Sequence, residues 1–142
     1  MLLRRLSCSF AGGLVGAFVD SFNIWILGVL GVTSLLGVGM TPEFTPPWLY
    51  PRLVWGGIFG LLFATSFLED RPIARGILFS LLPSALMLLV VLPNMGKGLL
   101  GQGFGTLTPA LVVGLNFIWG IVGAYWYRLS VGSNTFRGEV II

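Results

Sequence analysis

Long stretches without a charged residue constrain this chain more than any motif does. Residues 6–19, 21–42, 53–68, 76–96 and 98–127 contain no Asp, Glu, Lys or Arg. A helix that crosses a bilayer needs about 20 mostly apolar residues, and several of these stretches are long enough. Only 9% of the 142 residues are charged and 56% are hydrophobic, whereas a soluble domain is about one quarter charged. The sequence therefore predicts an all-α integral membrane protein.

Four transmembrane helices account for these stretches. We expect them near residues 9–35, 49–68, 73–92 and 107–127, within a single membrane domain that covers residues 1–142. The expected connections contain residues that end helices: a proline-rich loop before residue 52, a polar turn at 69–72 and a glycine-rich loop at 94–105. Pro83 falls inside the third helix, where a kink is tolerated because neighbouring helices satisfy the freed carbonyl.

The basic residues are distributed unevenly over the two sides of this predicted bundle. With four crossings, the side that holds both termini carries six of them, Arg4, Arg5, Arg71, Arg75, Arg128 and Arg137, and the opposite side carries Arg52 and Lys97. Because cytoplasmic segments carry the excess of Lys and Arg, we expect cytoplasmic termini in a bacterial inner membrane. Aromatic residues near the expected helix ends fit the interfacial belts: Trp48, Tyr50, Tyr125, Trp126 and Tyr127.

Two parts of the chain resemble each other at a constant offset. Adding 64 takes Leu36 to Leu100, Gly37 to Gly101 and Trp55 to Trp119. The offset predicts a tandem duplication of a two-helix unit, at 9–68 and 73–128, followed by a tail at 129–142. Because each unit crosses the bilayer twice, the two copies have the same topology and a pseudo-two-fold axis along the membrane normal. Chance recurrence of Gly, Leu and Trp in apolar helices is the alternative.

Small residues recur every four positions in three of the expected helices. Such rows let two helix backbones approach closely in lipid, where apolar side chains alone give little driving force. The rows favour helix packing, within the chain or against a partner, over a specific dimer motif. The six positions are Gly12, Gly16, Gly56, Gly60, Gly120 and Ala124.

Asp20 is the most unusual residue, because a carboxylate at membrane depth is expensive and must face protein or water. Asn23 lies one turn further on the same helix, and Asn116 should reach a similar depth in the fourth helix. One interpretation is a proton- or cation-handling site formed by these three residues. The other is a hydrogen-bonded cluster that fixes how the first and fourth helices meet. Arg52, at the outer end of the second helix, is expected to extend to water rather than inward.

Several kinds of chemistry lack their usual residues. The chain has no histidine and one cysteine, Cys8, so we expect no haem or zinc site, and no metal site. No catalytic triad or paired carboxylates appear, so an enzyme is not expected, and the scattered basic residues do not indicate a nucleic-acid partner. Aromatic residues make up 13% of the chain, which leaves contact with lipid, quinone or pigment open.

A polar residue precedes a glycine by four positions in two of the helices. Arg52 precedes Gly56, and Asn116 precedes Gly120. This pattern resembles small, uncharacterised bacterial multi-pass inner-membrane proteins with glycine-rich helices. The resemblance implies an architecture and no activity. A histidine often occupies the polar position in such proteins, and its absence here means that no ligand role carries over.

Two functions fit these observations. The first is a non-catalytic accessory or structural subunit of a larger membrane complex of the respiratory or photosynthetic type, with other membrane subunits and lipid as its partners. The lack of catalytic residues and the abundance of small-residue faces favour it. The alternative is a small homo-oligomeric transporter or channel that uses the buried carboxylate of Asp20.

Overall fold

The computed structural model describes residues 2–132, and over that range the chain is helical with no strand. The helices are α1 (Leu2–Val29), α2 (Val32–Leu35), α3 (Pro46–Gly60), α4 (Pro72–Leu86), α5 (Leu92–Asn94) and α6 (Thr108–Val131). Two 3-10 turns, η1 (Leu61–Ala64) and η3 (Leu99–Gly101), and a π-helical turn, η2 (Met87–Val91), lie between these helices along the chain. The expected tail at 129–142 begins later, because α6 continues to Val131, and residues 133–142, including Arg137, lie outside the described residues.

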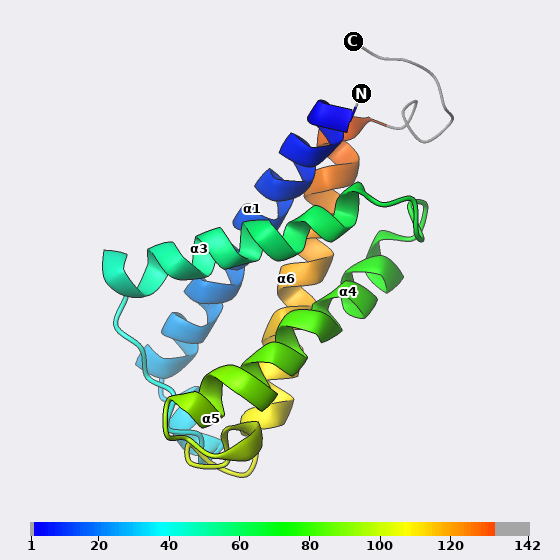
Figure 1. The fold of residues 1–142 in the computed structure, drawn as a ribbon. Helices are drawn as coiled ribbons and strands as arrows, with labels where there is room; N and C mark the ends of the chain where they lie inside the picture. Colours follow the sequence, from blue (N-terminus) through cyan, green and yellow to red (C-terminus); the bar gives the residue numbers. More distant parts are fainter. Residues whose placement is uncertain (1, 133–142) are drawn as a thin grey trace.

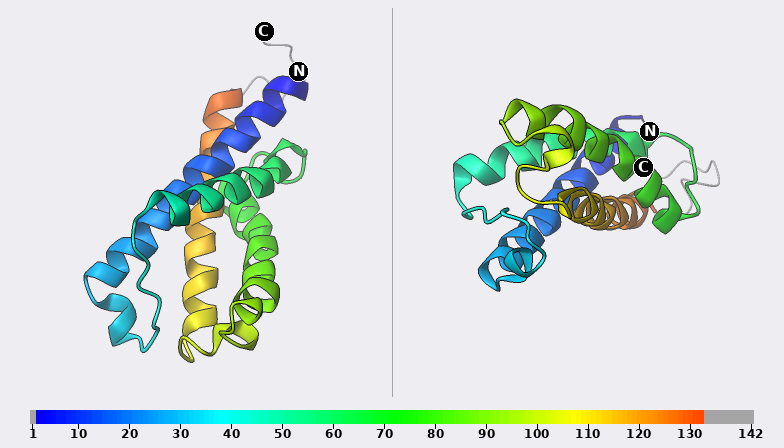
Figure 2. Two further views of the ribbon diagram at one scale, coloured as in Figure 1. Left: turned by 60° about the vertical axis from the view of Figure 1, so that its left-hand side comes forward. Right: turned by 90° about the horizontal axis from the view of Figure 1, so that it is seen from below.

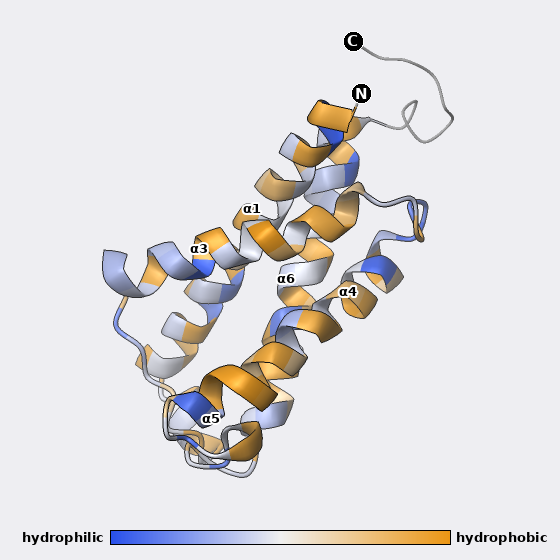
Figure 3. Ribbon diagram, viewed as in Figure 1, coloured by the Kyte–Doolittle hydropathy of each residue, from blue (hydrophilic) through white to orange (hydrophobic). Residues whose placement is uncertain are grey.

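Among residues 2–132, three helical segments are long and apolar enough to cross a membrane, which indicates an integral membrane protein. They are α1, the continuous run Pro72–Asn94 and α6. Hydrophobic residues predominate along these helices, and hydrophilic residues occur at turns and at a few places within α1 and α6 (Figure 3). The helix expected at 49–68 begins earlier, at Pro46, and ends earlier, because α3 changes to a 3-10 turn after Gly60 and that turn ends at Ala64. The expected first helix breaks at Gly31, which adopts a left-handed conformation with φ of 80°.

The helices follow the spatial order α3, α1, α6, α4 (Figures 1 and 2). α1 packs along both α3 and α6, and α4 packs along α6, but no extensive contact joins α3 to α4. The beginning of α1 and the end of α6 lie together, since Arg4 Nη2 donates to the carbonyl of Val131 at 3.2 Å. The central pair of the bundle therefore consists of α1 and α6, the first and last of the described helices.

Glycines mark the points where the helices cross. A Cβ added to Gly60 would lie 2.6 Å from the Cα of Gly13, and one added to Gly12 would lie 2.8 Å from the carbonyl oxygen of Gly123. Gly76 and Gly120 meet backbone to backbone in the same way between α4 and α6. The remaining predicted packing positions also lie at contacts between helices or in the core: Gly16 against Trp119, Gly56 against Ala17, and Ala124 in the buried core.

The arrangement is only partly symmetric. Within each expected unit the two helices cross at paired glycines, Gly13 with Gly56 and Gly76 with Gly120. A two-fold axis that exchanged the units would also convert the α1–α6 interface into an equivalent α3–α4 interface, and no such interface is formed. The tandem duplication therefore stays a prediction, and the described helices do not form a closed two-fold bundle.

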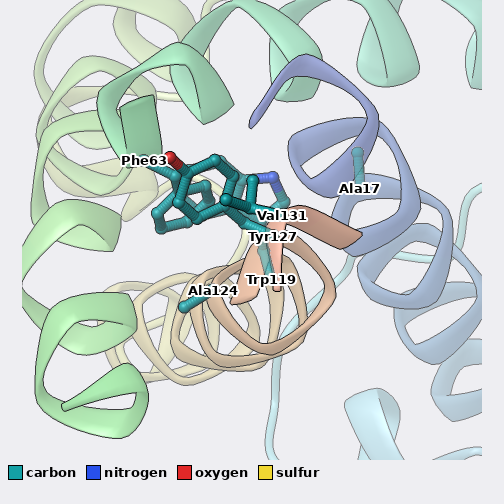
Figure 4. Packing of buried hydrophobic residues seen from close by; sticks show 6 residues of the cluster. All are labelled: Ala17, Phe63, Trp119, Ala124, Tyr127 and Val131. Atoms are coloured by element: carbon teal, nitrogen blue, oxygen red, sulfur yellow. The ribbon is translucent and has the colours of Figure 1, made fainter. Parts of the chain in front are cut away.

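The main core cluster lies where α1, η1 and α6 meet. It consists of Ala17, Phe63, Trp119, Ala124, Tyr127 and Val131 (Figure 4). Trp119 Nε1 donates to the carbonyl of Gly13 at 2.9 Å, so this buried indole has its hydrogen-bond partner. Tyr127 is fully buried, and its expected place in an interfacial belt is wrong. Tyr125 and Trp126 are exposed, as that belt requires.

Candidate functional site

Asp20 and Arg52 form an ion pair between α1 and α3. Arg52 Nη2 lies 3.2 Å from Asp20 Oδ2, and Arg52 Nε donates to Ser21 Oγ at 2.8 Å. Asp20 is 7% exposed, whereas the side chain of Arg52 retains 23% of its accessible surface. The guanidinium therefore turns inward, and the expectation that it extends to water is wrong. The reason is that α1 and α3 pack antiparallel and cross where Gly13 meets Gly56 and Gly60. Arg52 lies one to two turns before these glycines on α3, and Asp20 lies about two turns after Gly13 on α1, so the two side chains are neighbours.

The plane of the guanidinium is supported by an aromatic ring. The Cζ atom of Arg52 lies 4.9 Å from the ring centre of Trp48, one turn earlier on α3, which is within the range of a cation–π interaction. Trp48 in turn contacts Phe44, which packs on Trp25 of α1. The aromatic contacts hold Arg52 in place, and they explain how a long side chain stays directed toward α1.

A cavity of about 440 Å³ lies beside this ion pair, where α3 and α4 diverge. Its polar residues are Asp20, Arg52 and Asn116. Aromatic and aliphatic side chains form most of the remaining wall, contributed by α3 (Pro51, Trp55, Phe59), by α4 and η2 (Pro83, Leu86, Met87, Val91) and by α1 and α6 (Ala17, Trp119), with Gly56 beside them. The cavity therefore combines an apolar wall with a small polar group of fixed orientation.

The backbone of the α4 side of this cavity is irregular. Pro83 lacks the N–H that would continue the helical ladder, and one turn later the chain forms the π-helical turn Met87–Val91. Pro83, Met87 and Val91 all contribute to the cavity wall. A π-helical turn within an α-helix is uncommon and is often found at functional sites. The irregular backbone therefore coincides with the cavity.

The two asparagines that were grouped with Asp20 have different surroundings. Asn116 contributes to the cavity wall, and its Nδ2 donates to Ser84 Oγ at 3.0 Å, which joins α6 to α4. Asn23 is half-buried and lies outside the cavity wall, and its side chain makes no hydrogen bond within residues 2–132. The structure thus brings Asp20, Arg52 and Asn116 to one cavity and leaves Asn23 apart.

A second polar cluster lies at the end of the bundle where α1 begins and α6 ends, and it was not expected from the sequence. Arg75 is 1% exposed, and its Nη2 donates to the carbonyls of Phe63, at 2.6 Å, and Thr65. Its guanidinium carbon also lies 5.2 Å from the ring centre of Tyr127. One signal could have located it: Gly76, Ser80 and Ser84 form a small-residue row on α4, and Arg75 adjoins the start of that row.

Arg5 completes this second cluster. It forms an ion pair with Glu69, and its Nε donates to the hydroxyl of Tyr127 at 3.0 Å. Arg5 belongs to α1, Glu69 precedes α4 and Tyr127 lies near the end of α6, so the contacts join three segments. These contacts connect segments that are far apart in the sequence. Arg5 and Arg75 also belong to the six basic residues from which the sequence predicts cytoplasmic termini.

No group of three His, Cys, Asp or Glu side chains that could hold a metal ion occurs among residues 2–132. The polar groups at the cavity can instead donate and accept hydrogen bonds. Comparison of the chain with protein-family models, curated proteins and solved structures finds no match.

Replacing Arg52 with glutamine is expected to lower the free energy of unfolding in detergent by about 2 kcal/mol. The change leaves the Asp20 carboxylate buried without a cation, and breaking a fully buried pair costs about 3–5 kcal/mol. The smaller figure is expected because Arg52 is partly exposed. Thermal unfolding followed by circular dichroism measures the loss.

Two further variants test that this loss comes from the ion pair. Arg128→Gln is the matched control, because Arg128 reaches only an exposed carbonyl, that of Asp70 at 3.4 Å. The double variant Asp20→Asn/Arg52→Gln should be more stable than Arg52→Gln alone, since it removes both charges. Equal stability of the double variant and the single variant would show that the loss in Arg52→Gln does not come from an unpaired Asp20 carboxylate.

Proposed function

We propose that this chain is a non-catalytic structural subunit of a larger membrane complex, of the respiratory or photosynthetic type, in a bacterial inner membrane. The supporting observation is an apolar hollow of about 440 Å³ beside α1 and α6. It is lined by Leu27, Leu36, Leu107, Ala110, Leu111, Gly114, Leu115 and Ile118. Gly114 and Ala110 are exposed within it, so the backbone of α6 is accessible at this point.

The hollow supports an intermolecular role because of how the other glycines of α6 are used. Gly120 and Gly123 meet neighbouring atoms of the same chain, whereas a Cβ on Gly114 would meet nothing within 4 Å. Ala110 and Gly114 are four residues apart, the spacing at which small residues let a second helix approach. A helix of another subunit would fill this hollow and bury the small residues.

The expected partner is a different membrane protein, bound in a fixed ratio. Extraction in a mild detergent, followed by mass spectrometry of the species that co-migrate, should identify stoichiometric foreign subunits. Ala110→Leu and Gly114→Leu fill the hollow and should release these subunits, whereas Ala85→Leu, at an exposed position of α4, should retain them. A chain that migrates alone, or that keeps its partners in all three variants, would contradict the proposal.

The alternative is a small homo-oligomeric transporter or channel that uses Asp20. It has less support, because Arg52 already neutralises this carboxylate and three polar residues alone reach the cavity. Reconstitution in liposomes distinguishes the two functions. A homo-oligomer whose ion flux is abolished by Asp20→Asn, and retained in Asn23→Leu, would favour the transporter.

A further inference from the structure

The cavity between α3 and α4 shares no lining residue with the apolar hollow on the other side of α6. Aromatic rings of Trp55, Phe59 and Trp119 and aliphatic side chains of α4 and η2 form its apolar part. Its volume of about 440 Å³ is within the range of roughly 300–1,000 Å³ that small-molecule sites occupy. We propose that this cavity binds an uncharged, carbonyl-bearing lipophilic molecule.

The charges at the cavity favour an uncharged molecule. Asp20 and Arg52 neutralise each other at 3.2 Å, so the polar part of the cavity has no net charge to balance a second ion. Transfer of an unpaired ion into an apolar environment is strongly unfavourable. A fatty acid carboxylate or an ammonium group would therefore be a poor occupant, and a neutral headgroup is favoured.

The hydrogen-bond donors of Arg52 favour a headgroup that accepts hydrogen bonds. Arg52 uses Nε and Nη2 toward Ser21 and Asp20, and its Nη1 makes no hydrogen bond within the described part of the chain. Arginine has only donors, and this one is held in place by the ring of Trp48. A carbonyl oxygen of the bound molecule would satisfy Nη1. A hydroxyl on the same headgroup could donate to the amide oxygen of Asn116.

The shape of the site fits a molecule with a long apolar body. α3 and α4 are joined by residues 61–71 at one end and diverge toward the other (Figure 1), and residues of both helices line the cavity. Pro83 and the π-helical turn shape the α4 side of this opening. The apolar tail would extend between the two helices into the lipid, while the headgroup stays beside Arg52.

A lipophilic quinone and a neutral acylglycerol share this chemistry, so both are used as probes. Purified protein in nanodiscs is titrated with decylubiquinone, with dioleoylglycerol and with oleate, and binding is followed by tryptophan fluorescence and by the shift in unfolding temperature. We expect saturable binding of one neutral probe and at least tenfold weaker binding of oleate. The neutral probe that binds more tightly identifies the source of the carbonyl.

Two matched pairs of variants locate the binding site. Val91→Phe fills the cavity, whereas Val90→Phe adds the same ring at an exposed position of the same π-helical turn. Asn116→Leu removes a polar group from the wall, whereas Asn23→Leu makes the same change outside it. Val91→Phe and Asn116→Leu should each weaken binding at least tenfold, and the two controls should leave it unchanged.

Unfolding temperatures without a probe show whether each variant folds, and either cavity variant, Val91→Phe or Asn116→Leu, suffices for the test together with its control. Equal binding in wild type and in both cavity variants would overturn the proposal. Preferential binding of oleate, or no saturable binding of either neutral probe, would also overturn it. Loss of partner subunits in the Gly114→Leu variant concerns the other hollow, so the two proposals can fail separately.

Discussion

Replacing Arg75 with alanine is expected to destabilise the protein more than any other single truncation of a charged residue. The guanidinium is buried and donates to two backbone carbonyls, those of Phe63 and Thr65, at the end of η1. A buried acceptor that loses its donor costs about 1–3 kcal/mol, and a desolvated cation–π contact contributes up to about 2 kcal/mol. The combined loss should be roughly 4 kcal/mol, which lowers the unfolding temperature in detergent by about 10 °C or more.

Two variants separate the geometry of Arg75 from its charge. Arg71→Ala removes an exposed arginine from the residue that precedes α4, so it should leave the unfolding temperature nearly unchanged. Arg75→Lys keeps the charge, but an ammonium group lacks the planar fork that reaches both carbonyls, so it should recover only part of the stability. Equal unfolding temperatures for Arg75→Ala and Arg71→Ala would show that the buried guanidinium does not hold η1 to α4.

Replacing Gly120 with alanine should separate α4 from α6. A Cβ at this position would overlap the backbone of Gly76, with its carbonyl carbon at 2.7 Å and its Cα at 3.1 Å. Backbone atoms cannot turn aside as a flexible side chain can, so one helix must move. Overpacking of this kind costs about 1–3 kcal/mol, and the upper end is expected because the neighbour is a helix backbone.

Gly114→Ala is the matched control for Gly120→Ala, because both glycines lie in α6. A Cβ on Gly114 meets nothing within 4 Å, and alanine is the better helix former by up to about 1 kcal/mol. The isolated chain should therefore be unchanged or slightly more stable. Thermal unfolding in detergent measures both variants, and an equal response of the two would mean that the Gly76–Gly120 approach does not limit how the helices pack.

Much of the fold follows from the spacing of charges along the sequence. Three of the four expected helices are present as long apolar segments, and their bounds agree to within a few residues except at the first. The six small residues that were expected to pack helices lie at helix contacts or in the core. Spacing predicts these features because periodicity and small-residue rows act locally, within one helix.

The features that sequence did not predict all depend on where one helix lies relative to another. Arg52 turns inward because α3 runs antiparallel to α1 with Ser21 and Asp20 beside it. Tyr127 is buried because Arg75 and Arg5 approach it from other helices. The missing α3–α4 interface is likewise a property of the whole bundle. The sequence pattern within a single helix contains none of this information.

The spatial order of the helices has a consequence for biosynthesis. In space the long helices are neighbours in the order α4, α6, α1, α3, whereas along the chain they occur in the order α1, α3, α4, α6. A circularly permuted chain that began with α4 would have the same order in sequence and in space. In the natural order the face of α1 that includes Gly12 and Gly16 stays without its partner until α6 emerges from the ribosome, because Gly12 meets Gly123 and Gly16 meets Trp119. The packing of α1 and α4 on α6 therefore follows the synthesis of all the other described helices, and a chain truncated before residue 108 would lack the helix on which the other two long helical segments pack.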